Sequence, residues 1–369
     1  ENIVYPKDED RKDAYKNYTE IGKDVVRVSW GKQNEKRMLD AVKMDPRKLK
    51  VTGHVGMDFL REPLNRYYLS REELFVKYQV PEDKKVILFA SPYYGDQLGE
   101  SYIKDMCFRF GDNWVDYYRF MCESQVQALG WMERILQEDE SVCFVFRPHP
   151  GHPSRCAQEL AEKYDNFKII SGESVKQWIV ACDKVYTGNS SVVVEAYFAK
   201  KMCQLLFPLP VTEGFELKLI SDSAKITDFE GFKASVYADS EEFPTPRESI
   251  EEIYLIDWTE PSYIKFADMA EEVLKSDYYR LSKEQLKGCQ PVYTGATKVI
   301  KELSKIDLLY RPYLALLKNE KIKAGFLERQ RLIRSQAYRI EQEHSHELTS
   351  EKEVQSIIGR IANTLSGAR

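Results

Sequence analysis

The feature that most constrains the fold is a regular alternation of short apolar runs and helix-like segments between residues 82 and 207. The apolar runs are KVILFAS at 85–91, followed by SVCFVFRP, FKIISG, DKVYTGN and MCQLLF. Apolar runs bounded by turn residues are typical of strands that are buried on both faces of a parallel sheet. Strands that alternate with helices at this spacing predict right-handed βαβ units. We therefore expect an α/β fold with a doubly wound, Rossmann-like parallel sheet.

Four segments between these strands are predicted to be helices, at 117–137, 153–164, 174–182 and 190–201. Pro153 and Ser154 suit the N-terminus of the second helix. The last segment contains three consecutive valines, and β-branched residues on their own favour a strand. Its position between two predicted strands is what favours a helix there.

The chain divides into three regions by composition. Its 369 residues are enough for two domains with buried cores. Pro81 and the charged cluster after it indicate a boundary, which predicts a partial N-terminal α/β region over 1–81. A Rossmann-like domain is predicted over 82–305, and a helical C-terminal tail over 306–369.

Composition also limits the cellular setting and the partners. A formal net charge of −5 argues against a protein that coats nucleic acid, so no nucleic-acid partner is expected. No apolar run approaches the roughly 20 residues that cross a bilayer, and the N-terminus has no apolar core of a signal peptide. The seven cysteines are scattered without zinc spacing, which indicates reduced thiols and a cytoplasmic location.

Polar loops follow three of the predicted strands, at 90–101, 147–150 and 188–191. In open α/β sheets, ligands bind at the carboxyl ends of the strands, so these loops should meet at one edge. The guanidinium of Arg147 suits a phosphate, and His149 can donate a hydrogen bond or act as an acid near neutral pH. A histidine before a proline is as often structural, and both interpretations stay open at this point.

The loop at 188–191 leads from a strand into a helix, and helix N-termini attract phosphate. Ser190 and Ser191 can cap this helix or donate their hydroxyls to phosphate oxygens. Glu195 lies about one helical turn further on, where a carboxylate can accept both hydrogen bonds of a ribose diol. The alternative is purely structural, with Ser190 as the N-cap and Glu195 as an acid favoured by the helix dipole.

Several familiar motifs are absent from the sequence. It contains no P-loop, no G-x-G-x-x-G fingerprint, no D-x-D metal clamp and no G-x-S-x-G elbow. The sequence therefore disfavours an ATPase, an ordinary NAD-dependent enzyme and a serine hydrolase. We expect an enzyme that needs neither a metal nor a bound cofactor.

The ordered set VTGHVGMDFLR, ILFASPYYGD, FVFRPHP and KVYTGNSSVVVEAYFAKK resembles bacterial surface-carbohydrate glycosyltransferases of the GT-B fold. These include capsule-type Kdo transferases, polysialyltransferases and teichoic-acid polymerases. The resemblance implies a GT-B-like protein whose 82–305 region binds a nucleotide-sugar donor and whose N-terminal half, partial or shortened here, binds the acceptor. The implied donor-binding residues are Ser91, Tyr94, Arg147, His149, Asn189, Ser190, Ser191 and Glu195.

The implied activity is the transfer of a sugar from a CMP-Kdo-like or other CMP-, CDP- or UDP-linked donor to a growing surface polysaccharide. Such a reaction needs charge stabilisation on the leaving nucleotide and a base for the acceptor hydroxyl. His149, Asp96 and Glu100 are the predicted catalytic residues, with Asp58 a weaker candidate for the base. The segment at His54 departs from the family pattern, so the base is not carried over. The alternatives are a sugar-nucleotide 2-epimerase of the same fold and a non-catalytic glycan- or partner-binding remnant.

From Arg311 onward, helix formers dominate, with an intermittent apolar face. The stretch 329–339 combines four arginines with Leu, Ile and Tyr. A solvated helix face is one interpretation, and contact with anionic lipid or a polyanionic substrate is the other. The predicted partners of the 311–345 helices are the inner face of the membrane or another chain.

Overall fold

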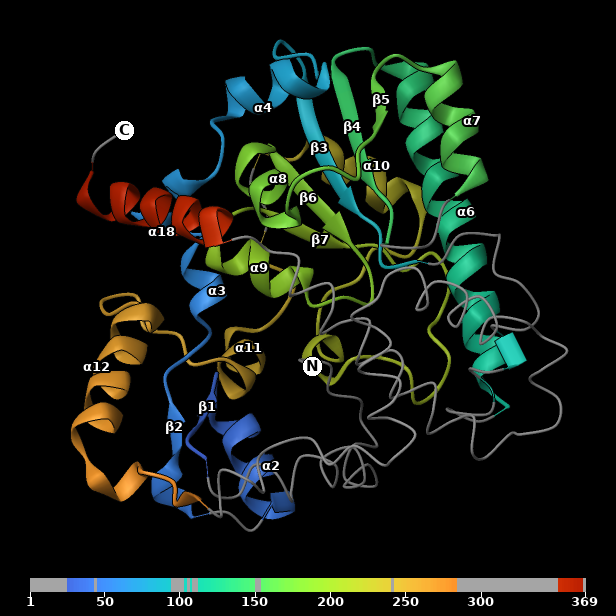
Figure 1. Ribbon diagram of the computed structural model, residues 1–369. Coiled ribbons are helices and arrows are strands. Elements are labelled where there is room, and N and C mark those ends of the chain that lie inside the picture. The colour runs from blue at the N-terminus through green and yellow to red at the C-terminus, as the bar shows by residue number, and fades with distance from the viewer. Residues whose placement is uncertain are drawn as a thin grey trace, which may run out of the picture. The chain divides into compact units, whose positions relative to one another are not determined.

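The computed structural model describes residues 25–42, 45–93, 103–104, 107, 112–149, 154–239, 242–283 and 351–367 (Figure 1). The chain forms two compact units, Glu1–Arg280 and Leu281–Arg369. The described residues of the first unit form two parallel sheets, one of five strands and one of two strands.

The larger sheet is doubly wound, as the alternation of strands and helices predicts. Its strands are β3 (Lys85–Ala90), β4 (Val142–Arg147), β5 (Phe167–Ile169), β6 (Lys184–Thr187) and β7 (Cys203–Leu205). They are all parallel and lie in the order β5-β4-β3-β6-β7. The chain builds outward from β3 to β5, returns to the other side of β3, and continues through β6 to β7. The reversal between β3 and β6 is a topological switch point, where α/β sheets bind ligands.

Helices cover both faces of this sheet (Figure 1). On one face lie α6 (Trp114–Glu138), α7 (Arg155–Lys163) and α10 (Phe229–Tyr237), and on the other α4 (Arg71–Tyr78), α8 (Val175–Ala181) and α9 (Val192–Phe198). The predicted helices are confirmed, including the valine-rich one. Val193 and Val194 are fully buried in α9. Their burial outweighs the strand preference of β-branched residues, which depends on context.

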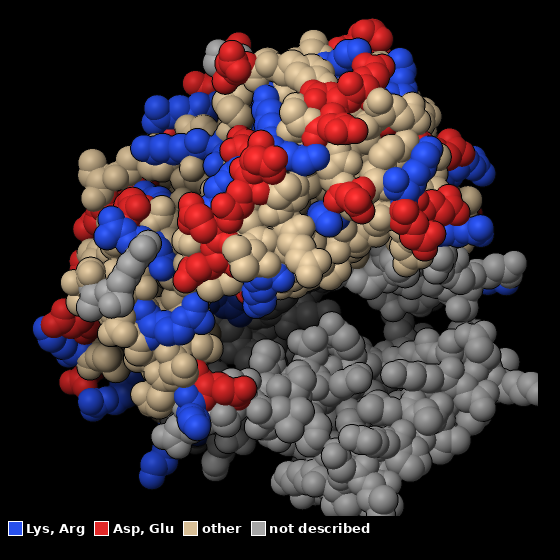
Figure 2. Space-filling view, turned by 90° about the horizontal axis from the view of Figure 1, so that it is seen from above, with Lys and Arg blue, Asp and Glu red and all other residues tan. Residues whose placement is uncertain are grey.

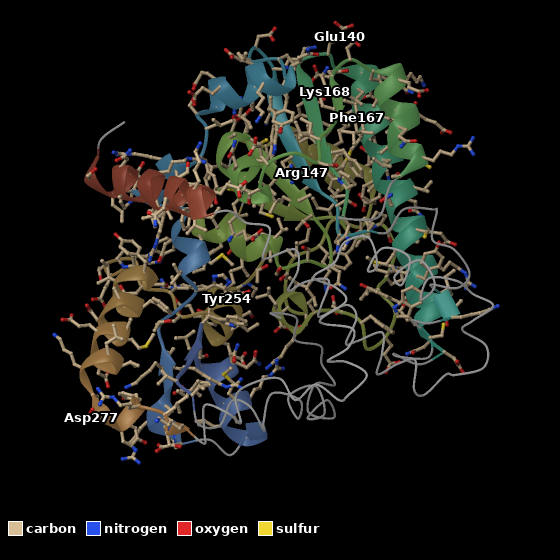
Figure 3. The ribbon with its side chains drawn as sticks, in the orientation of Figure 1. Glu140, Arg147, Phe167, Lys168, Tyr254 and Asp277 are labelled. Atoms are coloured by element: carbon tan, nitrogen blue, oxygen red, sulfur yellow. The ribbon has the colours of Figure 1, made fainter. Side chains whose placement is uncertain are left out.

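The smaller lobe contains β1 (Arg27–Ser29), α2 (Lys32–Val42) and β2 (Leu49–Val51), with the two strands parallel. The short helix η2 (Pro46–Lys48) lies between α2 and β2. After β2 the chain forms α3 (Val55–Asp58) and η3 (Leu64–Tyr67). The chain returns to this lobe late. The helices α11 (Arg247–Ile253) and α12 (Ser262–Lys275) pack against α2 and α3, preceded by η4 (Lys218–Ile220) and followed by η5 (Asp277–Tyr279). Tyr254 and Asp277 therefore lie with the smaller lobe, whereas Phe167 lies in the larger sheet, at the start of β5 (Figure 3).

In the second unit, the described residues form α18 (Glu351–Ser366). This helix exposes the apolar side chains of Val354, Ile357, Ile358 and Leu365. The basic stretch 329–339 and the other helices predicted over 311–345 lie outside the described residues. Among the helices of the described ranges, none combines the length and the apolar character that crossing a membrane requires. In the view of Figure 2, acidic and basic side chains are interspersed over the described surface.

A buried ion pair fastens α12 to α3. The Asp58 side chain is only 1% exposed and that of Arg61 11%, and an Arg61 Nη2 donates to Asp58 Oδ1 at 2.6 Å. The other carboxylate oxygen accepts the backbone N–H of Tyr263 at the start of α12, at 2.8 Å. Arg61 Nη1 also donates to the carbonyl of Asp257. Asp58 was a weaker candidate for the catalytic base. Its carboxylate is buried and both of its oxygens accept hydrogen bonds from the protein, which gives it a structural role here.

Asp58→Ala should lower the free energy of unfolding by about 3–5 kcal/mol, because it leaves the Arg61 charge buried without a partner. The matched control is Asp116→Ala on α6, whose ion pair with Arg119 is more than 60% exposed on both sides. That change should cost no more than about 1 kcal/mol. Urea denaturation measures both, and equal costs for the two variants would contradict the role given to Asp58.

Candidate functional site

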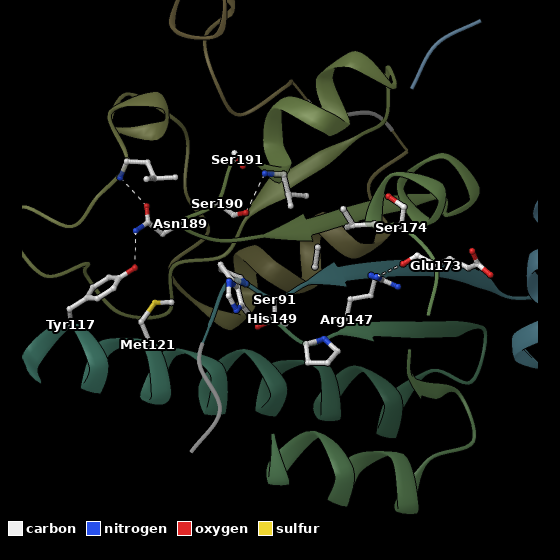
Figure 4. A pocket seen from close by; sticks show the side chains of 16 residues that line it. Ser91, Tyr117, Met121, Arg147, His149, Glu173, Ser174, Asn189, Ser190 and Ser191 are labelled. Carbon is white, nitrogen blue, oxygen red and sulfur yellow. Dashed lines mark hydrogen bonds between the residues drawn. The ribbon is translucent and has the colours of Figure 1, made fainter. Parts of the chain in front are cut away.

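A cavity of about 470 Å³ opens at the carboxyl edge of the larger sheet, at the switch point (Figure 4). The loops after β3, β4 and β6 all line it, as the sequence predicts for loops at one sheet edge. It contains six of the predicted site residues, namely Ser91, Arg147, His149, Asn189, Ser190 and Ser191. Glu195 lies one turn further along α9. Tyr94, Asp96 and Glu100 lie outside the described residues.

Arg147 braces the wall of the cavity with its guanidinium. It donates to the carbonyls of Gly172 at 2.6 Å, Glu173 at 2.8 Å and Ile170 at 3.4 Å. Burial lowers the pKa of this guanidinium from its usual value. Glu173 has a positive φ of 61°, a conformation that costs energy for a non-glycine residue and needs support from its surroundings. The fork of Arg147 therefore holds a strained segment in place.

His149 is exposed at the mouth of the cavity, two residues beyond the end of β4. In Figure 4 its imidazole lies at the strand ends, on the side of the cavity reached by Ser91 and Ser190. An exposed imidazole at this edge can reach a bound anion and donate a hydrogen bond to it. Its position fits the predicted role.

The two serines after β6 differ in what their hydroxyls do. Ser190 Oγ accepts the backbone N–H of Val192 at 3.2 Å, so it is used in capping the start of α9. Ser191 makes no side-chain capping bond, and within the described part of the chain its hydroxyl has no partner. Ser190 therefore has a structural role, although the N-cap of α9 is Ser191 and not Ser190 as the alternative predicted. The hydroxyl of Ser191 can donate to a ligand. Because α9 has only seven residues, its dipole adds little.

Asn189 fixes the opposite wall. Its Nδ2 donates to the carbonyl of Phe215 at 2.8 Å, and its Oδ1 accepts the N–H of Leu217 at 2.9 Å. This clamp places Leu217 on the cavity surface, and Tyr117 of α6 stacks on Phe215 with ring centroids 4.4 Å apart. Asn189 was predicted to bind nucleotide, but its amide is engaged with the protein backbone here.

Glu195 is a half-buried carboxylate. Burial raises its pKa, and the nearby Lys176 opposes that shift. Across the described ranges, its oxygens form no hydrogen bond or ion pair. Tyr68 lies close by, and burial together with the Glu195 charge raises the pKa of its hydroxyl to about 12. A carboxylate taken out of water without donors is costly unless a ligand supplies them.

The sequence did not indicate several further cavity residues, among them four that come from α6 and from the chain after β5. Tyr117 and Met121 come from the first half of α6, and Ser174 and Val175 follow β5. The α6 residues belong to an apolar stripe that is typical of a helix core. The loop after β5 could have been found, because it follows a predicted strand at the same sheet edge. No group of three or more His, Cys, Asp or Glu side chains suited to a metal ion occurs among the described residues.

No protein-family model matches the chain, and no curated protein does. Several solved structures match at low similarity. The wall teichoic acid polymerase TagF matches with 17% identity and a TM-score of 0.44, over 73% of this chain and 62% of TagF. A UDP-N-acetylglucosamine 2-epimerase matches with 17% identity and a TM-score of 0.40, over 74% and 61%. S. aureus MnaA with UDP matches with 14% identity and a TM-score of 0.34, over 77% and 61%.

The matched structures are a teichoic-acid polymerase and UDP-N-acetylglucosamine 2-epimerases. The first class is one that the sequence resembles, and the second is the class given as its alternative. This chain spans less than two thirds of the length of each. At these identities and TM-scores, the likeness carries neither a substrate nor a reaction to this chain.

Arg147→Met should loosen the 170–173 segment, at about 0.5–1.5 kcal/mol for each bond lost. The carbonyls of Ile170 and Glu173 lose the guanidinium donor, and that of Gly172 keeps only Trp178 Nε1. Hydrogen exchange of peptides that cover residues 168–176 should then be faster, while peptides from β3 stay protected. Arg119→Met, which removes an exposed arginine from α6, is the control and should leave both regions unchanged. Unaltered exchange over 168–176 in the Arg147 variant would show that the guanidinium does not hold this wall.

Proposed function

We propose that this protein is a glycosyltransferase that uses a nucleotide-activated sugar and extends a bacterial surface polysaccharide. The observation that carries the proposal is that His149 and Ser191 line one cavity at the switch-point edge, with Glu195 about one helical turn beyond Ser191 on α9. Within the described residues, neither the Ser191 hydroxyl nor the Glu195 carboxylate has a partner. Donors suited to phosphate and an acceptor suited to a diol are the two requirements of a ribonucleotide. The cavity volume of about 470 Å³ lies within the range of small-molecule sites.

In the proposed reaction, the bond between the sugar and the nucleotide phosphate breaks, and negative charge grows on the leaving phosphate. His149 and Ser191 donate hydrogen bonds to that oxygen, which stabilises the transition state more than the bound donor. Arg147 and Asn189 keep the two walls in place, so the donors are oriented before the reaction begins. Removal of one such donor costs on the order of 10²–10³ in kcat.

Cytidine- and uridine-linked sugars are the proposed donors, with CMP-Kdo the first to be tested. The acceptor is an oligosaccharide or a lipid-linked glycan. We place the reaction in the cytoplasm because scattered, unpaired cysteines are typical of that compartment. Contact of residues 311–345 with the inner membrane face belongs to the same proposal.

CMP, CDP and UDP should each be titrated against the protein by calorimetry, and at least one should bind. With the matching sugar donor and an oligosaccharide acceptor, His149→Ala should lower kcat by about 10²–10³-fold. Its melting temperature should stay unchanged because the side chain is exposed. Absence of binding by all three nucleotides would refute the proposed function. Binding without turnover of any donor would favour a non-catalytic module, and sugar isomerisation without an acceptor would favour an epimerase.

Glu195→Gln should raise the stability of the folded protein while weakening its recognition of the ribose. Since burial raises the pKa of Glu195, ionisation penalises the folded state above the usual carboxyl pKa. The variant should therefore be more stable than wild type at pH 7–8, and the gain should vanish near pH 4, where the carboxyl is protonated. Calorimetric melting at the two pH values measures this difference. Glu162→Gln, at an exposed position on α7, is the control.

The same variant should lose discrimination between a ribonucleotide and its 2′-deoxy analogue. Hydrogen bonds to a charged group contribute about 1.5–3 kcal/mol, which corresponds to roughly 10–150-fold in affinity. The wild type should prefer the ribonucleotide by that margin, and Glu195→Gln should remove most of the preference. A preference that survives the substitution would show that Glu195 does not contact the diol.

A further inference from the structure

A group of ionisable side chains lies between the two lobes, beside the cavity. We name His54, Lys176 and Glu195 the seam cluster. His54 precedes the first turn of α3 in the smaller lobe, and Lys176 and Glu195 lie on α8 and α9 of the larger lobe. The helices α3 and α9 are in contact. The cluster therefore joins the two halves of the first unit.

The side chains of Lys176 and His54 both lie next to Gly56. Lys176 Nζ donates to the carbonyl of Gly56 at 2.8 Å. A side-chain carbon at Gly56 would lie 2.8 Å from His54 Cε1, 3.1 Å from its Nδ1 and 3.1 Å from Lys176 Nζ. The ammonium of Lys176 and the imidazole of His54 therefore both border position 56, where an added side chain would require one of them to move.

The surroundings of His54 favour its neutral form. Burial lowers the pKa of the imidazole most, and the charge of Lys176 lowers it further, while Asp58 opposes them. The ring packs at 5.5 Å against Trp30, and its side chain does not cap α3. A neutral imidazole is the form that accepts a proton.

The seam cluster adjoins the cavity on two sides. Ser174 and Val175, directly before Lys176, line the cavity, as do Ser191 and Val192, one turn before Glu195. A donor whose phosphate contacts Ser191 and whose ribose contacts Glu195 therefore passes close to the smaller lobe. Among the described residues of this lobe, His54 is the histidine, and its imidazole lies beside Lys176 at Gly56. Asp58, at the end of α3, is buried in its ion pair.

We propose that His54 is the catalytic base of the transfer, an inference that rests on the proposed function. Its ring nitrogen accepts the proton of the acceptor hydroxyl while that oxygen forms a bond to the anomeric carbon of the sugar. The bond from this carbon to the phosphate oxygen breaks, and the electron pair leaves with the nucleotide. The proton then passes from the imidazole to solvent. Lys176 is a positioning residue, because it holds the Gly56 turn and keeps the imidazole neutral.

The first test compares His54→Gln and His54→Ala with the wild type, using the nucleotide sugar that proves active. Both variants should lose about 10²–10⁴-fold in kcat, since this is the usual contribution of a general base. Their affinity for the nucleotide should be unchanged, because the proposed nucleotide contacts are made by His149, Ser191 and Glu195 and not by His54. Added imidazole should restore part of the activity of His54→Ala only. A merely structural role for His54 would give no such rescue.

The second test measures the proton affinity of His54 directly. The chain has five histidines, so each Cε1–H signal can be assigned by single substitution in NMR spectra. Lys176→Met should raise the pKa of His54, and the acid limb of kcat/KM should move to higher pH with it. Lys200→Met is the matched control, since that exposed lysine lies over the ring of Trp258, and it should change neither.

The outcomes separate the two proposals. Transfer by His54→Gln at the wild-type rate would overturn the inference and leave the proposed function standing. An acid limb that stays in place while the pKa of His54 moves would also overturn it. If the wild type binds no nucleotide, both the proposed function and this inference fail.

Discussion

The parallel pairing of β3 with β4 on one side and with β6 on the other is the constraint on which the rest of the structure depends. It directs the carboxyl ends of three strands to one edge, where their loops enclose the cavity. The opposite edge, where the strands begin, has a structural role. There Lys85 and Lys184 donate to carbonyls at the end of α10, where cations are favoured. At the other edge, within the described residues, the hydroxyl of Ser191 has no partner and is available to a ligand.

The strands and helices of the larger sheet could be predicted because their signals are local. Apolar runs and helical spacing determine each element within ten or twenty residues, and α/β topology then follows from their alternation. The return of α11 and α12 to the smaller lobe could not be predicted in this way. It depends on contacts such as that between Asp58 and the N–H of Tyr263, which are far apart in the sequence and have no periodic pattern.

For the site, the sequence predicted where the residues lie but not what their side chains contact. The sequence placed Arg147, Asn189, Ser190 and Ser191 at one sheet edge, and the cavity contains all four. It could not assign their partners. Arg147 bonds to carbonyls more than twenty residues away, and Asn189 clamps Phe215 and Leu217. The side chains best suited to phosphate by type thus build the walls, and His149 and Ser191 face the space between them.

Within the described residues, Glu195 and His54 share two properties: burial shifts the pKa of each, and neither forms an ion pair. Burial shifts the pKa values of Glu195 and His54 in opposite directions, yet each shift favours the neutral form. A protein selected for stability alone would pair these groups, as it pairs Asp58 with Arg61 in the adjacent helix. Lys176 could have formed an ion pair with Glu195 but donates to the Gly56 carbonyl instead. Clusters of this kind occur preferentially at functional sites, where a substrate completes the missing hydrogen bonds.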